Sequence, residues 1–494
     1  MTLSALLSQR ASEFPRKLCI KFEDKKFTYS DIDTMVTHAA RGLGKMGLQH
    51  GERVAILMSN CPEYIISYFA ILRAGGTAVP VNTFLTPSEV AYILRDSACR
   101  IFIYNDPFLS HAEKIRKDIP ELDTITFEEI PDATELPEAS REDDIAAFIY
   151  TSGTTGFPKG AMLTHGNLIA NVTSCKEVMQ LSQRDRILLF LPLFHSFSFT
   201  VCVLLPIYSG ATIVLLQSVK PFSKIIKSVL QDRITFFVAV PTVYNILSRK
   251  KISPLMRHLI RFLINVRACV SGAAALPEST LSTFQKKFNV PLIEGYGLTE
   301  ASPVVAVNPL KGVRKPSSVG LPIPGVTVQV VGENGESLAT GEAGELIARG
   351  PNIMQGYYGK PEETEAVLKD GWLYTGDMAT IDADGYISIV DRKKDLIIVD
   401  GMNIYPREVE DVIMRNHSVE ECSMVGIPDG RGSELTVLFV KRKETASVDE
   451  KELRALMKGS LARFKIPRRI MFIEEFPKTA TGKIKKTELR KWKL

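Results

Sequence analysis

The chain has 494 residues, of which 45% are hydrophobic and 24% charged, and its formal net charge is +5 at pH 7. This length exceeds what a single compact core usually spans, so we expect two or more domains. The composition is that of a soluble globular protein, and so small a net charge gives no argument for binding nucleic acid.

The N-terminal hundred residues alternate between predicted strands and helices. A hairpin is expected over residues 22–29, followed by a helix to about residue 45 that Ser30 caps, with Asp33 three residues on. Strands are predicted at 52–58, 78–81 and 100–104, and helices at 62–74 and 87–96. This alternation predicts a doubly wound α/β region. The acidic, proline-containing residues 118–143 are expected to form a surface connection.

A loop rich in glycine and threonine follows the apolar run 145–150 and has the sequence TSGTTGFPKG over residues 151–160. Glycines let backbone N–H groups approach a ligand closely, hydroxyls donate hydrogen bonds or bind magnesium, and Lys159 adds a positive charge. These properties suit a polyphosphate, with a flexible surface loop as the alternative. The loop is not a Walker A motif, because Pro158 precedes Lys159 and Gly160 follows it.

Residues 187–219 contain no Asp, Glu, Lys or Arg and are long enough to cross a membrane. Pro192, His195, Pro206 and Gly210 interrupt them, so we interpret the stretch as a buried strand, loop, helix and strand, and expect no transmembrane segment. The N-terminus lacks the basic start of a signal peptide. Seven scattered cysteines without a CxxC pair favour a reducing, cytoplasmic location.

Two further candidate nucleotide-binding elements each follow a predicted strand. Residues 272–275 follow the strand 267–271, and residues 295–300 follow the strand 290–294. Ligands of α/β sheets bind beyond the carboxyl ends of the strands, so all three elements are expected to face one crevice. Glu300 can there hold magnesium with Thr151 as its hydroxyl partner, or it can be a charge at a helix N-terminus.

The pattern changes beyond about residue 316, where short strands and glycine turns predict a β-rich subdomain. Asp382–Gly385 resembles the start of an EF-hand, but the remaining ligands are absent, so a tight turn is expected. The last hundred residues predict a small α+β unit with a basic tail. Its strands are expected at 396–399, 421–426 and 436–440, and its helices at 406–416 and 449–461.

Five motifs occur in order: YTSGTTGFPKG (150–160), YGLTE (296–300), YTGD (374–377), DRKKDLIIVDGMNIYP (391–406) and PKTATGK (477–483). Together they resemble the adenylate-forming (AMP-binding) superfamily, with bacterial fatty acyl-CoA synthetases the most similar members. The resemblance covers nearly the whole chain. It implies a large N-terminal ATP- and acyl-binding α/β domain, residues 1–393, and a small mobile α+β C-terminal domain, residues 394–494.

The resemblance also implies roles for single residues. The phosphate loop that binds the β- and γ-phosphates of ATP is implied to be Thr151, Ser152, Gly153, Thr154, Thr155, Gly156 and Lys159. The adenine pocket is implied to be Gly272, Ala273, Ala274, Glu294, Gly295 and Tyr296, with Gly297 beside it. Thr299 is the implied contact to the α-phosphate, and Asp377 and Arg392 are the implied contacts to the ribose. Lys394 is the implied hinge, where many members have Asp, and Gly401 is placed beside the CoA tunnel.

Lys483 and Glu300 are the implied catalytic residues. A carboxylate that attacks the α-phosphorus of ATP meets like charge, and a lysine with Mg²⁺ stabilises the charge that develops. Without the other motifs, Lys483 would be interpreted as a turn lysine.

The implied acyl pocket involves His195, Phe197, Phe199, Val238, Val240 and Pro241, and Gly297 is a further candidate wall. His195 is interpreted as a gate or orienting residue, with a hydrogen-bonded core histidine as the alternative. The uncharged walls suit a medium- or long-chain fatty acid, and they suit a benzoate or cinnamate as well.

We therefore expect a cytoplasmic enzyme that uses ATP, Mg²⁺ and CoA to convert a carboxylic acid into its CoA thioester through acyl-AMP. The alternatives are an aryl-CoA ligase, an enzyme that loads a carrier protein, and a non-catalytic nucleotide-binding protein. No nucleic-acid partner is expected, and peripheral membrane contact and a homodimer remain open.

Overall fold

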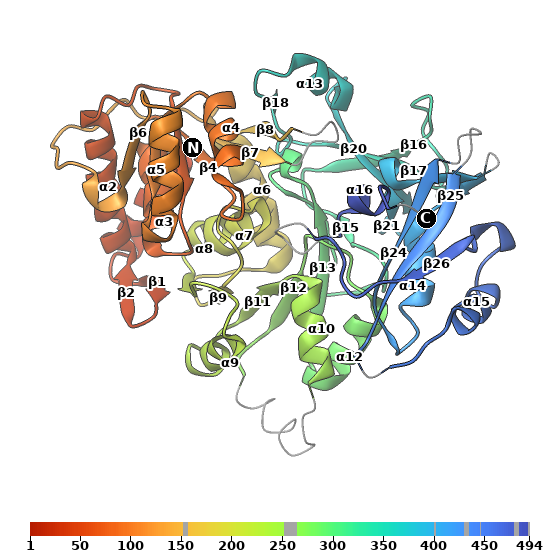
Figure 1. Cartoon of the computed structure of the whole chain (residues 1–494). Coiled ribbons are helices and arrows are strands. Elements are labelled where there is room, and N and C mark those ends of the chain that lie inside the picture. The colour runs from red at the N-terminus through yellow and green to blue at the C-terminus, as the bar shows by residue number, and fades with distance from the viewer. Residues whose placement is uncertain are drawn as a thin grey trace. The chain divides into compact units, whose positions relative to one another are not determined.

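The computed structural model describes residues 1–151, 157–250, 264–399, 402–428, 434–444, 446–478 and 484–492 (Figure 1). The chain forms two compact units. The first comprises Met1–Leu276, Thr280–Val328 and Ala348–Leu373, and the second comprises Pro277–Ser279, Gln329–Ile347 and Tyr374–Leu494. The boundary expected between residues 393 and 394 lies within the second unit and stays a prediction.

A seven-stranded sheet of the first unit carries the base of the glycine-rich loop. Its order is β18-β8-β7-β4-β3-β5-β6, formed by Gly356–Tyr357, Lys159–Thr164, Ile145–Thr151, Thr77–Pro80, Arg53–Leu57, Cys99–Tyr104 and Asp123–Thr126. Three helices connect its parallel strands: α3 (Pro62–Arg73), α4 (Pro87–Asp96) and α5 (Leu109–Asp118). Strand β6 corrects the prediction that residues 118–143 are only a connection, because Asp123–Thr126 pairs in parallel with β5.

A nine-stranded sheet of the first unit carries the other candidate elements. Its order is β15-β14-β13-β12-β11-β9-β10-β1-β2, formed by Leu321–Pro322, Val304–Val307, Leu292–Gly297, Ala268–Ser271, Phe236–Ala239, Arg186–Leu189, Thr212–Leu215, Leu18–Phe22 and Lys25–Thr28. Its helices include α1 (Leu3–Glu13), α2 (Tyr29–Lys45), α6 (His165–Met179), α9 (Phe222–Gln231), α10 (Pro241–Arg249) and α12 (Glu278–Phe288). Parallel strands joined by helices confirm the predicted α/β class.

The uncharged stretch 187–219 folds as β9, three consecutive short helices and β10. The helices are α7 (Ser196–Phe199), the π-helix η3 (Thr200–Leu204) and α8 (Leu205–Ser209). Within the described part of the chain, every helix is too short or too polar to cross a bilayer. The interpretation as buried strands and helices is therefore confirmed.

Helix α2 begins earlier than the sequence predicts. Its cap is Thr28, whose side chain accepts from the backbone of Asp31 at 3.1 Å, while the Asp31 carboxylate accepts from the Thr28 backbone at 2.7 Å. Strand β2 ends at Thr28, so the chain enters the helix without the extra residues that a cap at Ser30 requires.

A five-stranded sheet forms the predicted β-rich part. Its order is β16-β17-β20-β19 with β21 on β20, formed by Thr327–Val331, Gly344–Arg349, Trp372–Ile381, Leu368–Lys369 and Ile387–Arg392. Helix α13 (Pro361–Val367) precedes β19. The turn predicted at Asp382–Gly385 joins β20 to β21, and Gly385 takes a φ of +83° there.

The last hundred residues form the predicted small α+β part. The hairpin β22 (Ile397–Val399) and β23 (Met402–Ile404) precedes a three-stranded sheet of β24 (Val419–Pro428), β25 (Glu434–Arg442) and β26 (Arg469–Phe472). Helices α14 (Pro406–Ile413), α15 (Glu450–Lys458) and α16 (Lys486–Leu489) complete it. Buried aliphatic residues such as Ile404, Val409, Leu438 and Leu453 form its core.

Candidate active site

The base of the glycine-rich loop is a closed hairpin. Thr151 is the last residue of β7, Lys159 is the first residue of β8, and the two residues pair in antiparallel register. Ser152, Gly153, Thr154, Thr155 and Gly156 lie outside the described residues, so their proposed contact with phosphates stays a prediction.

One tyrosine adjoins two of the predicted site residues. The Tyr357 hydroxyl donates a 2.7 Å hydrogen bond to Oε1 of Glu300. The Lys159 ammonium lies 5.4 Å from the centre of the same ring and 3.9 Å from a carboxylate oxygen of Glu363. Burial, with the Glu300 charge and hydrogen bond as further causes, raises the pKa of Tyr357, so the phenol stays protonated as a donor. The structure thus brings Lys159 and Glu300 to one place.

Glu300 lies in the short helix η4 (Thr299–Ala301), and its backbone carbonyl accepts from the Met354 amide at 2.9 Å. Tyr357 engages Oε1, and the structure assigns Oε2 no donor among the described residues. This carboxylate suits Mg²⁺, which proteins commonly hold through one or two carboxylates together with substrate phosphates. Among the described residues no group of three or more His, Cys, Asp or Glu side chains could hold a metal by itself.

The predicted acyl gate lies beside the predicted nucleotide residues. The hydroxyls of Ser196 and Thr299 are 3.3 Å apart, which joins helix α7 to η4. His195 caps α7, and its Nδ1 accepts from the Phe197 amide at 3.3 Å. A Cβ at Gly272 would lie 2.7 Å from the Phe197 ring, so the ring closely approaches the backbone after β12.

The predicted adenine residues surround the ends of β12 and β13. Glu294 is buried, and its Oε1 accepts from the Leu276 amide at 2.9 Å, which fixes the loop that contains Ala273 and Ala274. Ala273 has a φ of +68°, a conformation that costs energy in a residue with a side chain. Gly295 and Tyr296 continue β13, opposite Val307 and Ala306 of β14.

Gly297 cannot carry a side chain in this arrangement. A Cβ there would lie 2.2 Å from the carbonyl oxygen of Pro303, to which the neighbouring Leu298 amide donates at 3.0 Å. The close contact holds the end of β13 against the segment that follows Glu300, so it fixes the start of η4.

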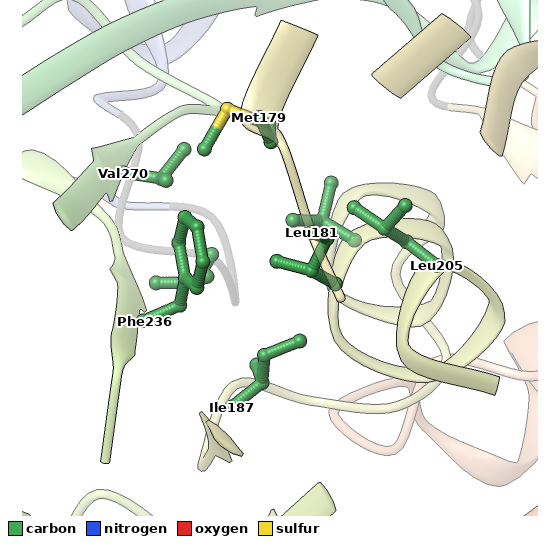
Figure 2. A pocket seen from close by; sticks show the side chains of 8 residues that line it. Met179, Leu181, Ile187, Leu205, Phe236 and Val270 are labelled. Atoms are coloured by element: carbon green, nitrogen blue, oxygen red, sulfur yellow. The ribbon is translucent and has the colours of Figure 1, made fainter. Parts of the chain in front are cut away.

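An apolar cavity lies between the nine-stranded sheet and the helices that follow β9 (Figure 2). Its volume is about 10 Å³, roughly the room that one water molecule needs, and it is lined by Met179, Leu181, Ile187, Val201, Leu205, Phe236, Val238 and Val270. The π-helix contributes Val201, and wide turns of this kind occur frequently at functional sites. Pockets for drug-sized ligands have volumes of about 300–1,000 Å³, so this cavity takes an acyl chain only if the lining side chains move apart.

Of the predicted pocket residues, Val238 lines this cavity. His195, Phe197, Phe199, Val240 and Pro241 do not contribute to its lining. Phe199 is buried and packs on Tyr68 of α3, with the ring centres 4.2 Å apart. Val240 and Pro241 form the start of α10 directly after β11.

The predicted ribose residues form a pair within the second unit. Asp377 on β20 lies opposite Arg392 on β21, and Nε of Arg392 is 3.4 Å from the Asp377 carboxylate. Glu345 holds this corner, because its carboxylate accepts from the Gly376 amide at 3.1 Å and from the Lys393 ammonium at 2.7 Å.

The predicted hinge residue Lys394 lies in the short helix η5 (Lys393–Asp395). Burial and then the neighbouring Arg392 lower the pKa of its ammonium. Arg490 contacts this segment through a 2.8 Å ion pair with Asp395. Gly401 and Lys483 lie outside the described residues.

Tyr357 is the residue that the sequence analysis missed. It follows Gly356 in the sequence MQGYYGK, where two adjacent tyrosines give no sign of which one reaches Glu300. The structure identifies it through strand pairing. Strand β18 pairs with β8, so Tyr357 is opposite Ala161, next to the glycine-rich hairpin.

Comparisons with known proteins show what the chain as a whole is similar to. A family model described as "AMP-binding enzyme" matches residues 7–358, and one described as "AMP-binding enzyme C-terminal domain" matches residues 408–483. The chain is 38% identical to a long-chain-fatty-acid–CoA ligase of Bacillus subtilis (strain 168), over 99% of this chain and 94% of that protein. It is 36% identical to a feruloyl-CoA synthase of Amycolatopsis sp, over 98% of this chain and 97% of that protein. The crystal structure of ATP-bound MatB from Rhodopseudomonas palustris superposes with a TM-score of 0.90 at 30% identity, over 99% and 98% of the two chains.

Proposed function

Because the chain belongs to the AMP-binding enzyme family, we propose that it activates a medium- or long-chain fatty acid with ATP and transfers the acyl group to CoA. A carboxylate oxygen of the acid attacks the α-phosphorus of ATP, and the bond to the bridging oxygen breaks to release pyrophosphate. The thiol sulfur of CoA then attacks the acyl carbonyl carbon, and AMP leaves with the electrons of the acyl–oxygen bond. The thiol proton passes to solvent.

The first step requires compensation of negative charge. We assign the β- and γ-phosphates to the glycine-rich loop and Lys159, and Mg²⁺ to Glu300 with Thr151. The 2.7 Å bond from Tyr357 supports this assignment, because it orients the Glu300 carboxylate. Lys483 is proposed as the cation at the α-phosphate, where a single electrostatic donor contributes about 10²–10³ in rate.

The remaining nucleotide contacts follow the same proposal. Asp377 accepts hydrogen bonds from the ribose hydroxyls, and Arg392 supports it through their 3.4 Å contact. Glu294, Gly295, Tyr296 and the loop Gly272–Ala274 border the adenine. Rotation about Lys394 then exchanges Lys483 for the segment of Gly401, which admits CoA.

The apolar lining of the cavity is the observation that favours a fatty acid, whose chain we place there with the lining side chains moved apart. Its eight lining side chains are all uncharged and apolar, so a second ionised group or a hydroxyl on the distal part of the acid would find no partner there. The similarity to a long-chain-fatty-acid–CoA ligase supports the same choice. The similarity to a feruloyl-CoA synthase makes an aromatic acid the competing substrate.

A panel of acids tests the proposal. Purified protein with ATP and Mg²⁺ is offered saturated acids of increasing length, ferulate and benzoate, and pyrophosphate release is measured with and without CoA. We expect the highest kcat/KM with medium or long saturated acids and CoA consumption equal to AMP formation. Preference for ferulate would contradict the substrate assignment, and adenylation without CoA consumption, restored by a carrier protein, would contradict the acceptor.

A further inference from the structure

One short stretch of the first unit is rich in positive charge. Residues 218–250 contain six Lys or Arg residues and one Asp, a net charge of +5, which equals the net charge of the whole chain. The basic C-terminal tail, residues 458–493, is a second such stretch, with twelve Lys or Arg residues and three Glu. All six cations are exposed, whereas Asp232 is buried and forms an ion pair with Lys21.

Exposed apolar side chains lie among these cations. Val219, Ile226, Leu230 and Ile246 are 38%, 37%, 41% and 51% exposed. On α9, Ile226 and Leu230 are four residues apart and share the outer face with Lys227, while Ile225 and Ser228 face inward. This is the pattern of an amphipathic helix whose outward side has not been made fully polar.

The two helices α9 and α10 present one surface. The Lys250 ammonium, just after α10, lies 4.9 Å from the centre of the Phe222 ring at the start of α9. Figure 1 shows both helices at the lower edge of the first unit. We call the exposed Val219, Lys220, Lys224, Ile226, Lys227, Leu230, Ile246, Arg249 and Lys250 the α9/α10 surface. Among the described residues, the only ion pair of these cations is a 3.8 Å contact of Lys224 with the exposed Glu23.

We propose that the α9/α10 surface binds an anionic lipid bilayer. Lysines near a bilayer are attracted to acidic headgroups, and aliphatic side chains between them gain by entering the boundary of headgroups and acyl chains. An acidic protein partner can pair with the lysines equally well, but acidic side chains make no favourable contact with the four exposed aliphatic side chains. The combination of both side-chain kinds therefore favours the bilayer.

The α9/α10 surface lies next in the chain to a strand that lines the apolar cavity. Helices α9 and α10 are the elements on either side of β11 in the chain, and β11 supplies Phe236 and Val238 to the apolar cavity. A bilayer held at α9 and α10 concentrates amphiphilic acids near the unit that binds them.

Vesicle sedimentation of the full-length protein tests the proposal without any turnover. The vesicles are phosphatidylcholine alone or phosphatidylcholine with phosphatidylglycerol. We expect binding to the anionic vesicles that weakens as salt rises, because salt screens exposed charges. The double variant Lys224→Glu, Lys227→Glu should bind roughly tenfold or more weakly. The double variant Ile226→Ser, Leu230→Ser should also bind more weakly while keeping its charge.

Helix α5 offers a matched control. Lys114 and Lys117 have the same spacing as Lys224 and Lys227, and Leu109 is 47% exposed. Lys114→Glu, Lys117→Glu and Leu109→Ser should bind vesicles as the unaltered protein does, and thermal unfolding verifies that every variant folds.

Four results would overturn the proposal: no vesicle binding at low salt, wild-type binding by the α9 charge variant, equal loss in the α5 variants, or loss on charge reversal with none on serine substitution. The last result, together with binding to polyglutamate, would identify an acidic protein as the partner. Because binding is measured without ATP or acid, it can fail while the ligase activity is intact, and the reverse also holds.

Discussion

Tyr357 and Glu300 are joined by a 2.7 Å hydrogen bond, in which the buried phenol donates to the carboxylate proposed to hold Mg²⁺. The two residues are 57 positions apart, and β18 brings them together by pairing with β8. The contact leaves Oε2 of Glu300 with no donor among the described residues, which suits a carboxylate that binds a cation. It also connects Glu300 with Lys159, whose ammonium lies over the same ring.

We expect Tyr357→Phe to slow acyl-AMP formation about tenfold or more. A hydrogen bond to a charged group contributes about 1.5–3 kcal/mol, and its loss frees the carboxylate to rotate away from the metal. The measurement is pyrophosphate release as a function of Mg²⁺ concentration, and the half-saturating concentration should rise. Tyr358→Phe is the control, because that ring packs on Phe148 at 4.7 Å. Equal rates and Mg²⁺ dependence in both variants would exclude an orienting role for Tyr357.

Val238→Phe should change chain-length preference. Val238 is 1% exposed and lines the apolar cavity, so a larger ring there blocks the place where the far part of an acyl chain is proposed to enter. We expect kcat/KM to fall most for the longest acids and least for short ones, measured across a series of saturated acids. Val214→Phe on β10 is the control, because Val214 is equally buried but does not line the cavity. A uniform loss across the series would show that the cavity does not receive the acyl chain.

Gly297→Ala should destabilise the protein by roughly 1–3 kcal/mol, because the added methyl group would overlap the Pro303 carbonyl, 2.2 Å away. Gly295→Ala is the matched change on the same strand, and its nearest neighbour would be 3.4 Å away. Thermal unfolding of the two variants gives the comparison. Equal melting temperatures would mean that the segment after η4 relaxes without cost.

His165 should make stability depend on pH. Burial lowers the pKa of this histidine from its ordinary 6.5 to about 4, opposed by Asp144 and Glu142 and assisted by the N-terminal ammonium. Its Nδ1 accepts from the Leu3 amide at 3.2 Å, so the folded state needs the neutral ring. Because the unfolded chain takes up the proton first, stability is fully present above pH 6.5 and decreases as the pH falls to about 4, by up to roughly 3 kcal/mol.

Urea unfolding at several pH values measures this decrease. His165→Asn keeps a side-chain acceptor for Leu3 and should flatten the profile between pH 6.5 and 4. The variant His38→Asn, at an exposed surface histidine, controls for general effects of losing a histidine. A profile that stays as steep in His165→Asn would assign the acid sensitivity to other groups.

Much of the fold could be predicted because the spacing of apolar residues agrees with the positions of capping and turn residues. Helix α4 has its predicted bounds at Pro87–Asp96, and the turn at Asp382–Gly385 is where its Asp and Gly indicated. Strand β6 was missed because Asp123–Thr126 has little apolar character and gains its place only by pairing with β5. Helix α9 was missed although its apolar residues, Phe222, Ile225, Ile226, Val229 and Leu230, recur with helical spacing.

Sequence motifs single out Glu300, Thr299, Asp377 and Arg392 as candidate site residues, and their roles stay predictions. Contacts between motifs could not be predicted from the sequence. No sequence spacing indicates the hydrogen bond from Tyr357 to Glu300 or the close approach of Phe197 to Gly272. Phe199 shows the converse. Its apolar character is equally suitable for a pocket wall and for the core, and it packs on Tyr68 in the core.

Oxygen-isotope transfer tests the central claim, that the acid attacks the α-phosphorus of ATP. The protein is given ATP, Mg²⁺, CoA and a saturated fatty acid whose carboxylate carries ¹⁸O at both positions, and the products are analysed by mass spectrometry after turnover. The account predicts one ¹⁸O atom in AMP and the other in the acyl group of the thioester. AMP without the label, or ¹⁸O in pyrophosphate or phosphate, would contradict it.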